Sequence, residues 1–340
     1  MLALLATLCL ADAPQTCAER LLPGPCDAGR AAAWAEARPE LVLGGTRCAP
    51  LAEAVAPLPV SEIAPGNFVH KGRHVLPDPA NLADQANIGF IVGEEAVAVI
   101  DAGGSRAIGE ALYAAIRAET GLPIRWLILT HMHPDHVFGA SVFAEAGASL
   151  IGHANLAAGL ANRAESYLDS LARQAGGALA IGSEIALPDA SVGDERDVDL
   201  GGRVLRLEAH PTAHTDNDLT VLDEATGTWW MGDLVFHEHL PTIDGSLRGW
   251  LALLDALEAR PASRIVPGHG GPVLPWPDGA APMRRYLEAL LVETREALAR
   301  GDSLGTAVPL IGADLRGEWE LFDTFHPRNA TAAYRELEWE

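Results

Sequence analysis

Basic residues are scarce in this chain, which has 24 Lys and Arg against 46 Asp and Glu and a formal net charge of −22 at pH 7. A chain this acidic repels polyanions, so the composition argues against nucleic acid or an anionic membrane surface as a partner. An internal repeat and an apolar run long enough to span a bilayer are also absent. Hydrophobic residues make up 49% of the chain, enough for a sizeable core in one large α/β domain with appendages, or in two domains.

Cysteine is also rare and unevenly placed. The chain has four cysteines, Cys9, Cys17, Cys26 and Cys48, all within the first fifty residues and at spacings that match no CxxC template. This pattern disfavours a thiolate metal site.

Residues 1–13 form an apolar run that closes on small residues. The run has the length and character of the hydrophobic part of a signal peptide, so it predicts export to the periplasm or the extracellular space. No Lys or Arg precedes the run, and a buried N-terminal helix is the alternative. Removal of these residues would leave Cys17, Cys26 and Cys48, enough for one disulfide and one free thiol, with the connectivity open.

Composition and periodicity divide the rest of the chain. Residues 14–59 are rich in Ala, Pro and Gly, with one helical patch at 28–37, and predict an appendage pinned by its cysteines rather than by a core of its own. Residues 60–300 predict the main folded domain, and residues 301–340 a helical tail packed on it. Within the domain we expect strands at 88–92, 96–100, 124–129, 149–152, 204–208, 219–222, 228–231 and 264–266, and helices at 105–119, 137–146, 155–174, 247–259 and 282–300.

The stretch 130–136 reads Thr-His-Met-His-Pro-Asp-His and directly follows the apolar run 124–129. Imidazole and carboxylate groups are good ligands for zinc and related first-row metals. This spacing lets one turn serve two neighbouring ions, because His131 and His133 can face one ion while Asp135 and His136 face a second. Each ion then needs a further protein ligand.

The later strand ends supply candidates for these ligands. His214 follows the strand at 204–208, Asp233 the strand at 228–231, and His269 the strand at 264–266. A catalytic zinc site keeps one position open for water, whose pKa then falls to about 7. The combination predicts a hydrolytic metal centre.

The chain contains, in this order, the motif HxHxDH at 131–136, a distal His, a distal Asp in a Gly-Asp pair and a final Gly-His. With this order of motifs it resembles the metallo-β-lactamase fold superfamily over residues 60–300. The resemblance implies an αββα four-layer sandwich with two Zn²⁺ ions at one edge; iron and manganese are the alternative metals. It also implies a ligand set: His131, His133 and His214 for the first ion, Asp135, His136 and His269 for the second, and Asp233 as a bridge together with a hydroxide. Asn87 and Asp101 match the early strands of the family, and we expect them to support the site rather than to bind metal.

The flanks of these motifs, with the cysteine-bearing extension, are similar to the quinoprotein relay system metallohydrolases and the related sulfur-oxidation-associated metallohydrolases. This similarity implies an exported hydrolase. From the set of seven ligands we expect a metal-bound hydroxide to attack an ester, thioester, lactone or amide, with Asp135 relaying a proton. A periplasmic quinoprotein dehydrogenase would be its partner and a small molecule its substrate. Two alternatives stay open: a mononuclear iron persulfide dioxygenase, and a non-catalytic periplasmic accessory or cofactor-binding factor.

Some residue types expected of the commonest carbapenem-hydrolysing enzymes are absent. Such an enzyme would carry Arg in place of His136 and Cys near Asp233, and this chain has neither, which disfavours a true β-lactamase. His237 and His239 are expected to line the pocket or orient ligands rather than bind metal. Trp229 and Trp230 are expected in the core.

Overall fold

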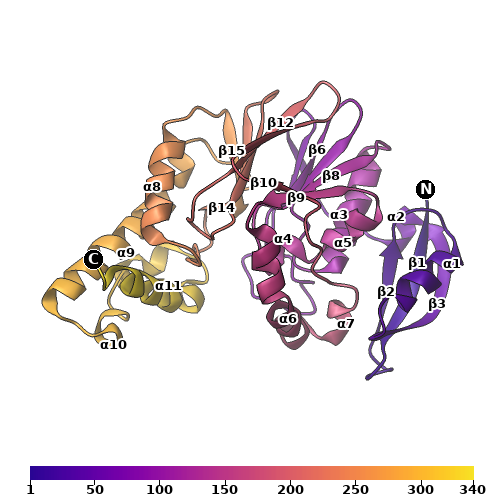
Figure 1. The fold of residues 1–340 in the computed structure, drawn as a ribbon, viewed down its shortest axis with the longest axis horizontal. Coiled ribbons are helices and arrows are strands. Elements are labelled where there is room, and N and C mark those ends of the chain that lie inside the picture. The colour runs from indigo at the N-terminus through magenta and orange to yellow at the C-terminus, as the bar shows by residue number, and fades with distance from the viewer.

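The computed structural model describes residues 1–340, and it has two β-sheets packed face to face with helices on both outer sides (Figure 1). This arrangement confirms the predicted αββα sandwich with a helical C-terminal tail. A small third sheet lies at the N-terminal end of the molecule (Figure 1). None of the helices is both long and apolar enough to cross a membrane.

The first sheet of the sandwich has seven strands in the order β10-β9-β8-β7-β6-β5-β4. Pairing is parallel from β7 to β10 and antiparallel from β4 to β7. The strands are β4 (Ser61–Ala64), β5 (Asn67–His70), β6 (Ile88–Val92), β7 (Val97–Ile100), β8 (Ile124–Ile128), β9 (Ser149–His153) and β10 (Ala190–Val192). The helices on this side are α3 (Arg106–Glu119), α4 (Pro134–Val137), α5 (Ala140–Glu145), α6 (Leu156–Ala175) and α7 (Gly177–Ala180).

The second sheet has five strands in the order β11-β12-β13-β14-β15, with only the last pair parallel. The strands are β11 (Glu195–Asp199), β12 (Val204–Ala209), β13 (Leu219–Asp223), β14 (Thr228–Phe236) and β15 (Arg264–His269). The outer helices are α8 (Leu247–Glu258), α9 (Ala281–Arg300), α10 (Leu304–Ala307) and α11 (Phe322–Leu337), with short 3₁₀ turns η1 (Asp278–Ala280) and η2 (Ala313–Glu318).

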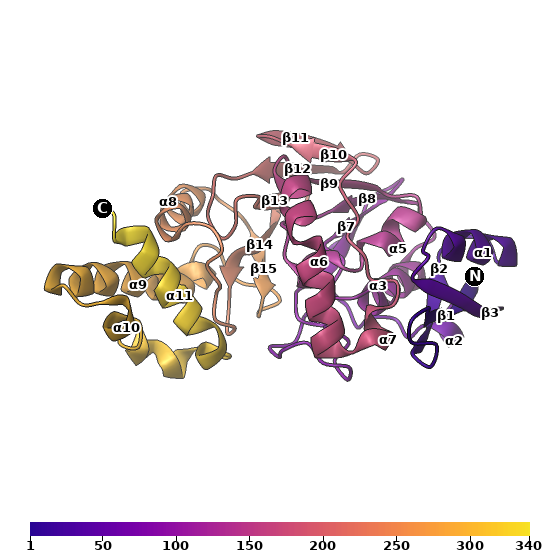
Figure 2. The same cartoon turned by 60° about the horizontal axis from the view of Figure 1, so that its bottom comes forward.

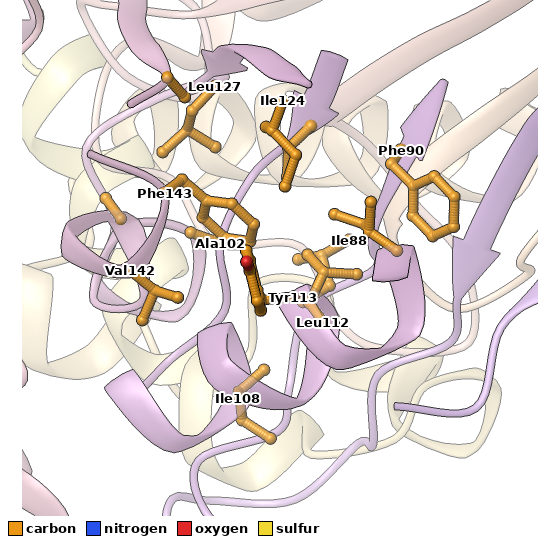
Figure 3. Close-up of a cluster of buried hydrophobic side chains, with 14 of the residues drawn as sticks. Ile88, Phe90, Ala102, Ile108, Leu112, Tyr113, Ile124, Leu127, Val142 and Phe143 are labelled. Atoms are coloured by element: carbon orange, nitrogen blue, oxygen red, sulfur yellow. The ribbon is translucent and has the colours of Figure 1, made fainter. Parts of the chain in front are cut away.

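The sandwich has one hydrophobic core between its two sheets and one between each sheet and its helices, and alternate residues of a strand face different cores. Ile88 and Phe90 of β6 face α3 and α5 (Figure 3), while Ile91 faces the other sheet. Because successive residues of a strand point to opposite faces, a strand buried on both faces is apolar throughout, as β6 and β7 are. Trp230 is buried between the sheets and Trp229 under the helices of the second sheet, so both lie in the core as expected.

Residues 1–13, predicted as a signal peptide, form part of a folded element in this structure. Strand β1 (Leu2–Leu10) is the centre of the three-stranded sheet β2-β1-β3, between β2 (Cys17–Leu22) and β3 (Leu41–Pro50). Removal of residues 1–13 would take away this central strand, and the signal peptide stays a prediction. The alternative of a buried N-terminal helix is wrong in its secondary structure, because the segment is a largely buried strand.

The appendage therefore includes residues on both sides of the predicted boundary at 14, and it has a core of its own. Leu4, Leu8 and Leu22 pack with α1 (Ala28–Glu36), which confirms the helix expected at 28–37. A second short helix, α2 (Leu51–Ala54), follows β3. All four cysteines of the full chain are paired, as Cys9–Cys17 and Cys26–Cys48, a connectivity that the sequence left open.

Three differences from the predicted elements bear on the site. Strand β14 continues to Phe236, so Asp233 lies within the strand, and β15 continues to His269. The helix expected at 137–146 is broken into α4 and α5 at Gly139. The backbone of Gly139 lies against α3, where an added Cβ would come within 2.8 Å of the Cα of Gly109. This close approach sets the position of the turn that precedes it.

Candidate metal centre

The turn after β8 is held in place by Asp101, which follows β7 in the left-handed region at φ 56°. Its carboxylate accepts hydrogen bonds from the Thr130 N–H and from the Thr130 hydroxyl, both at 2.8 Å. Pro134 then occupies the first turn of α4, a position that proline's restricted φ suits. The side chains of residues 131–136 are thus presented from a rigid strand-to-helix connection.

The second sheet and its loops deliver the remaining side chains to the same place. His214 comes from the loop after β12, Asp233 from β14 and His269 from the end of β15. Gly232 lets β14 approach the turn closely, because it has φ 51° and an added Cβ would lie 2.8 Å from the Cβ of Thr130. The structure therefore brings together all seven residues named from the sequence, in two groups.

The first group contains three imidazoles around one point. Nδ1 of His133 lies 3.1 Å from Nε2 of His131 and 2.9 Å from Nε2 of His214. Oδ2 of Asp233 completes the group, at 3.6 Å from Nε2 of His131 and 3.4 Å from Nε2 of His214. Three nitrogens and one carboxylate oxygen converge, which is the donor set of a tetrahedral zinc site.

The second group contains Asp135, His136 and His269. Oδ2 of Asp135 lies 3.2 Å from Nε2 of His269 and 3.7 Å from Nε2 of His136. Asp233 reaches this group as well, with Oδ1 at 3.1 Å from Nε2 of His136 and Oδ2 at 3.4 Å from Nε2 of His269. The carboxylate of Asp233 therefore lies within 3.6 Å of histidine nitrogens in both groups.

Each ring has a hydrogen-bond partner on its outer nitrogen. These partners are Thr130 Oγ1 for His131, Asp244 Oδ2 for His133, Asp101 Oδ2 for His136, the Thr242 carbonyl for His214 and the Gln85 carbonyl for His269, at 2.7 to 3.1 Å. A carbonyl or carboxylate oxygen can only accept, so the outer nitrogen of the ring it contacts donates. The partners therefore select the tautomer and orient the rings, as such groups do in metal sites. Asp101 has the supporting position predicted for it, and the Asn87 amide donates to the Pro267 and Gly270 carbonyls beside β15.

The inward-facing atoms match the chemistry of a bound cation. When the outer nitrogens of His131, His133 and His214 carry the protons, the three inner nitrogens are bare lone pairs, and Nδ1 of His133 lies within 3.1 Å of the other two. Nε2 of His136 and Oδ1 of Asp233 are buried without a hydrogen-bond partner. Unpaired buried polar atoms are costly, and a divalent metal would satisfy all of them at once.

In the metal-free protein, the pKa is lowered for two histidines of the first group and raised for His269 of the second. Burial, reinforced by the neighbouring His133 ring, lowers the pKa of His214 to about 3, and burial likewise lowers the pKa of His131. These rings are neutral at pH 7, as metal ligation requires. Burial also opposes the charged form of His269, but the Asp233 and Asp135 carboxylates outweigh it and raise the pKa of His269 to about 9. A cation in the second group would replace that proton.

A cavity of about 330 Å³ opens onto the metal centre. His133, Asp135, Asp233 and His269 lie in its wall, so both groups are accessible from it. The remaining wall comes from residues 76–85, from α6, from the segment after β14 and from α11. Figure 2 shows α6 and α11 on opposite sides of β14 and β15. The predicted C-terminal tail therefore contributes to the pocket as well as packing on the domain.

Several residues of the site were not named from the sequence. Asp244 and Thr242 lie in the loop before α8, and Arg163 and Arg328 lie on helices far apart in the chain; no motif marks any of them. His239 lines the cavity as expected, with its ring 4.8 Å from the His269 ring, whereas His237 is absent from the wall.

The αββα fold and the paired His/Asp groups at one end of the two sheets define a class of metal-centre proteins. A family model described as the metallo-beta-lactamase superfamily matches residues 82–269, more than half of the chain, and the chain belongs to this superfamily. No curated protein matches the chain.

Solved structures share this fold at low sequence identity. A β-lactamase domain protein from Burkholderia ambifaria is 23% identical with a TM-score of 0.62, over 84% of this chain and 89% of that one. A metallo-β-lactamase from Pontibacter korlensis is 18% identical with a TM-score of 0.55, over 68% of this chain and 99% of that one. The sec-alkylsulfatase Pisa1 from Pseudomonas sp. is 16% identical with a TM-score of 0.59, over 83% of this chain and 50% of that one. At these identities the likeness concerns the fold.

Proposed function

We propose that the protein is a dinuclear metal-dependent hydrolase. The observation that carries this proposal is the convergence of the bare inner nitrogens of His131, His133 and His214 with a carboxylate, beside a second complete group that shares Asp233. In the proposal, His131, His133 and His214 hold one ion, Asp135, His136 and His269 hold the other, and Asp233 bridges them. Zinc is the expected metal, because the donors are imidazole and carboxylate in a compact arrangement.

The bound metals supply the Lewis acidity that activates water and polarises a carbonyl oxygen. The chain's own residues perform the rest. Asp135 lines the cavity with its side chain 19% exposed, so it can accept a proton from the attacking water and return it to the leaving group. Phe236 and His239 form part of the pocket wall and exclude water from one side. The bonds we expect to be cleaved are those of esters, thioesters, lactones or amides.

Two finer parts of the proposal rest on other features. Both disulfides of the appendage suit an oxidising compartment, which supports a periplasmic or secreted location.

The association with a quinoprotein dehydrogenase rests on motif similarity alone. Its test is co-purification of the dehydrogenase with the wild-type protein and the His131→Ala variant, together with cellular alcohol oxidation. If co-purification and alcohol oxidation are both unchanged in the His131→Ala variant, hydrolysis has no role in that system.

The main experiment measures metal content and hydrolysis together. The purified protein is expected to bind two zinc ions per chain and to hydrolyse at least one ester, thioester, lactone or amide of a panel that also includes a phosphodiester and a β-lactam. His131→Ala should lose metal and activity, while His237→Ala, outside both groups and outside the cavity wall, should keep both. Absence of any bound transition metal, with no hydrolysis after addition of Zn²⁺ or Mn²⁺, contradicts the proposal. A single iron with oxygen consumption on a persulfide would assign the dioxygenase activity instead.

A further inference from the structure

The wall of the cavity away from the metal ligands is basic, in a chain with a net charge of −22. Arg163 and Tyr167 reach it from α6, and Arg328 reaches it from α11. The same cavity is lined by His133, Asp135, Asp233 and His269, so these basic side chains and the metal centre share one cavity. A small molecule bound at the centre would contact both.

Asp244 connects the two parts of the cavity. Its Oδ2 accepts hydrogen bonds from His133 Nε2 at 3.0 Å and from Arg163 Nη1 at 2.5 Å, and its Oδ1 accepts one from Arg328 Nη2 at 3.2 Å. One carboxylate thus faces two guanidinium groups, which leaves one positive charge uncompensated. The side chain of Asp244 is only 14% exposed, so the arrangement is partly shielded from water.

Each arginine has donors to spare. Arg163 makes protein hydrogen bonds only through Nη1, to Asp244 and to the Tyr167 hydroxyl at 3.4 Å, and Arg328 only through Nη2. The other guanidinium nitrogens have no protein partner, although the side chains are 35% and 63% exposed and so reach solvent. Burial raises the pKa of Tyr167, so its hydroxyl keeps its proton at neutral pH and adds a further donor. A planar guanidinium with free donors is suited to bidentate binding of an oxyanion.

We propose that Arg163 and Arg328, positioned by Asp244, bind an oxyanion group of the substrate, a carboxylate, sulfate or phosphate, while its scissile bond lies at the metal centre. This inference rests on the proposed hydrolase function, because it assigns a substrate class to the same cavity. A neutral substrate would leave the charge of this wall without a partner. Because Arg328 belongs to α11, the C-terminal tail takes part in substrate selection.

The first experiment compares paired substrates with the metal-loaded protein. Each pair has the same scissile bond, and one member carries a carboxylate where the other carries its methyl ester or amide. We expect a preference in kcat/KM for the anionic member, and we expect Arg163→Met and Arg328→Met each to reduce that preference about 10- to 100-fold. Arg163→Lys and Arg328→Lys should retain part of it. Arg173→Met on α6 and Arg335→Met on α11 are matched controls, since both residues lie outside the cavity wall.

The second experiment needs no activity. Acetate, inorganic sulfate and inorganic phosphate are titrated separately into the metal-free protein and followed by NMR, and the anion that binds most tightly identifies the group recognised. Binding should weaken about 10-fold or more in Arg163→Met and Arg328→Met but not in the controls. If no hydrolysis is found but this arginine-dependent binding is present, the hydrolase proposal fails and the anion site stands. If hydrolysis proceeds with equal kcat/KM for both members of every pair, and anion binding does not depend on the two arginines, the inference is overturned.

Discussion

Replacing Asp101 by Asn tests how the metal centre is oriented. The Asp101 carboxylate is buried and accepts three hydrogen bonds: from the Thr130 N–H, the Thr130 hydroxyl and His136 Nδ1. Asn has only one acceptor oxygen, and its NH₂ group must then face a donor. If the NH₂ faces Thr130 N–H, two donors meet. If it faces His136 Nδ1, that ring must move its proton to Nε2, the atom proposed to bind metal.

Both arrangements carry a calculable cost. One buried donor left without an acceptor lowers the free energy of unfolding by about 1 to 3 kcal/mol. Loss of the orienting carboxylate raises the metal dissociation constant about 10- to 100-fold. The first quantity is measured by urea unfolding of the metal-free protein, and the second by metal titration against a chelator of known affinity.

Asp314→Asn provides the matched control, because Asp314 is exposed and makes no side-chain hydrogen bond or ion pair. Its stability and metal affinity should equal those of the wild type. If Asp101→Asn also bound two metals with wild-type affinity, then Asp101 would not set the orientation of His136, and the assignment of His136 as a ligand would lose its structural basis.

Three other predictions concern the same centre. An added Cβ at Gly268 would overlap Oδ1 of Asp233, so Gly268→Ala should lower the metal content towards one ion per chain. The control Gly45→Ala has nothing within 4 Å of the added atom and should keep its metal content. Elemental analysis measures both variants. In the metal-free protein the pKa of His269 is raised to about 9 by nearby carboxylates against the effect of burial, so the folded state holds a proton that the unfolded state releases above about pH 6.5. The free energy of unfolding should therefore fall between about pH 6.5 and pH 9, and a rise across this window would contradict the assigned charge state. Chelation of the metals should lower Tm by roughly 5 °C or more in calorimetry, because only the folded chain assembles the site.

The ligands that lie close together in the chain could be predicted from the sequence. His131, His133, Asp135 and His136 are separated by one or two residues, so one turn must present them together whatever the rest of the fold does. His214, Asp233 and His269 were identified by their position after apolar runs, because strand ends of one sheet edge converge. The strands proved longer than expected at β14 and β15, since pairing between them continues beyond Met231 and Val266 to Phe236 and His269.

The N-terminal segment shows why an apolar run admits two interpretations. Leu4, Ala6 and Leu8 face the core of the appendage, while Ala3 and Leu5 face the core under α3 and α5. A strand buried on both faces has no polar alternation, so its sequence is as uniformly apolar as a signal peptide. The neighbouring strands of the full chain show the strand, and the signal peptide stays a prediction.

By itself, the sequence determined the candidate metal ligands and the superfamily, because ligand spacing is a property of short segments whose backbone geometry is constrained. The tertiary structure alone decided what surrounds these candidate ligands. Arg163, Asp244 and Arg328 are far apart in the chain and carry no motif, and they meet only because α6, the loop before α8 and α11 pack around the ends of β14 and β15. Contacts of this kind depend on how whole elements pack, and no local pattern of residues records them.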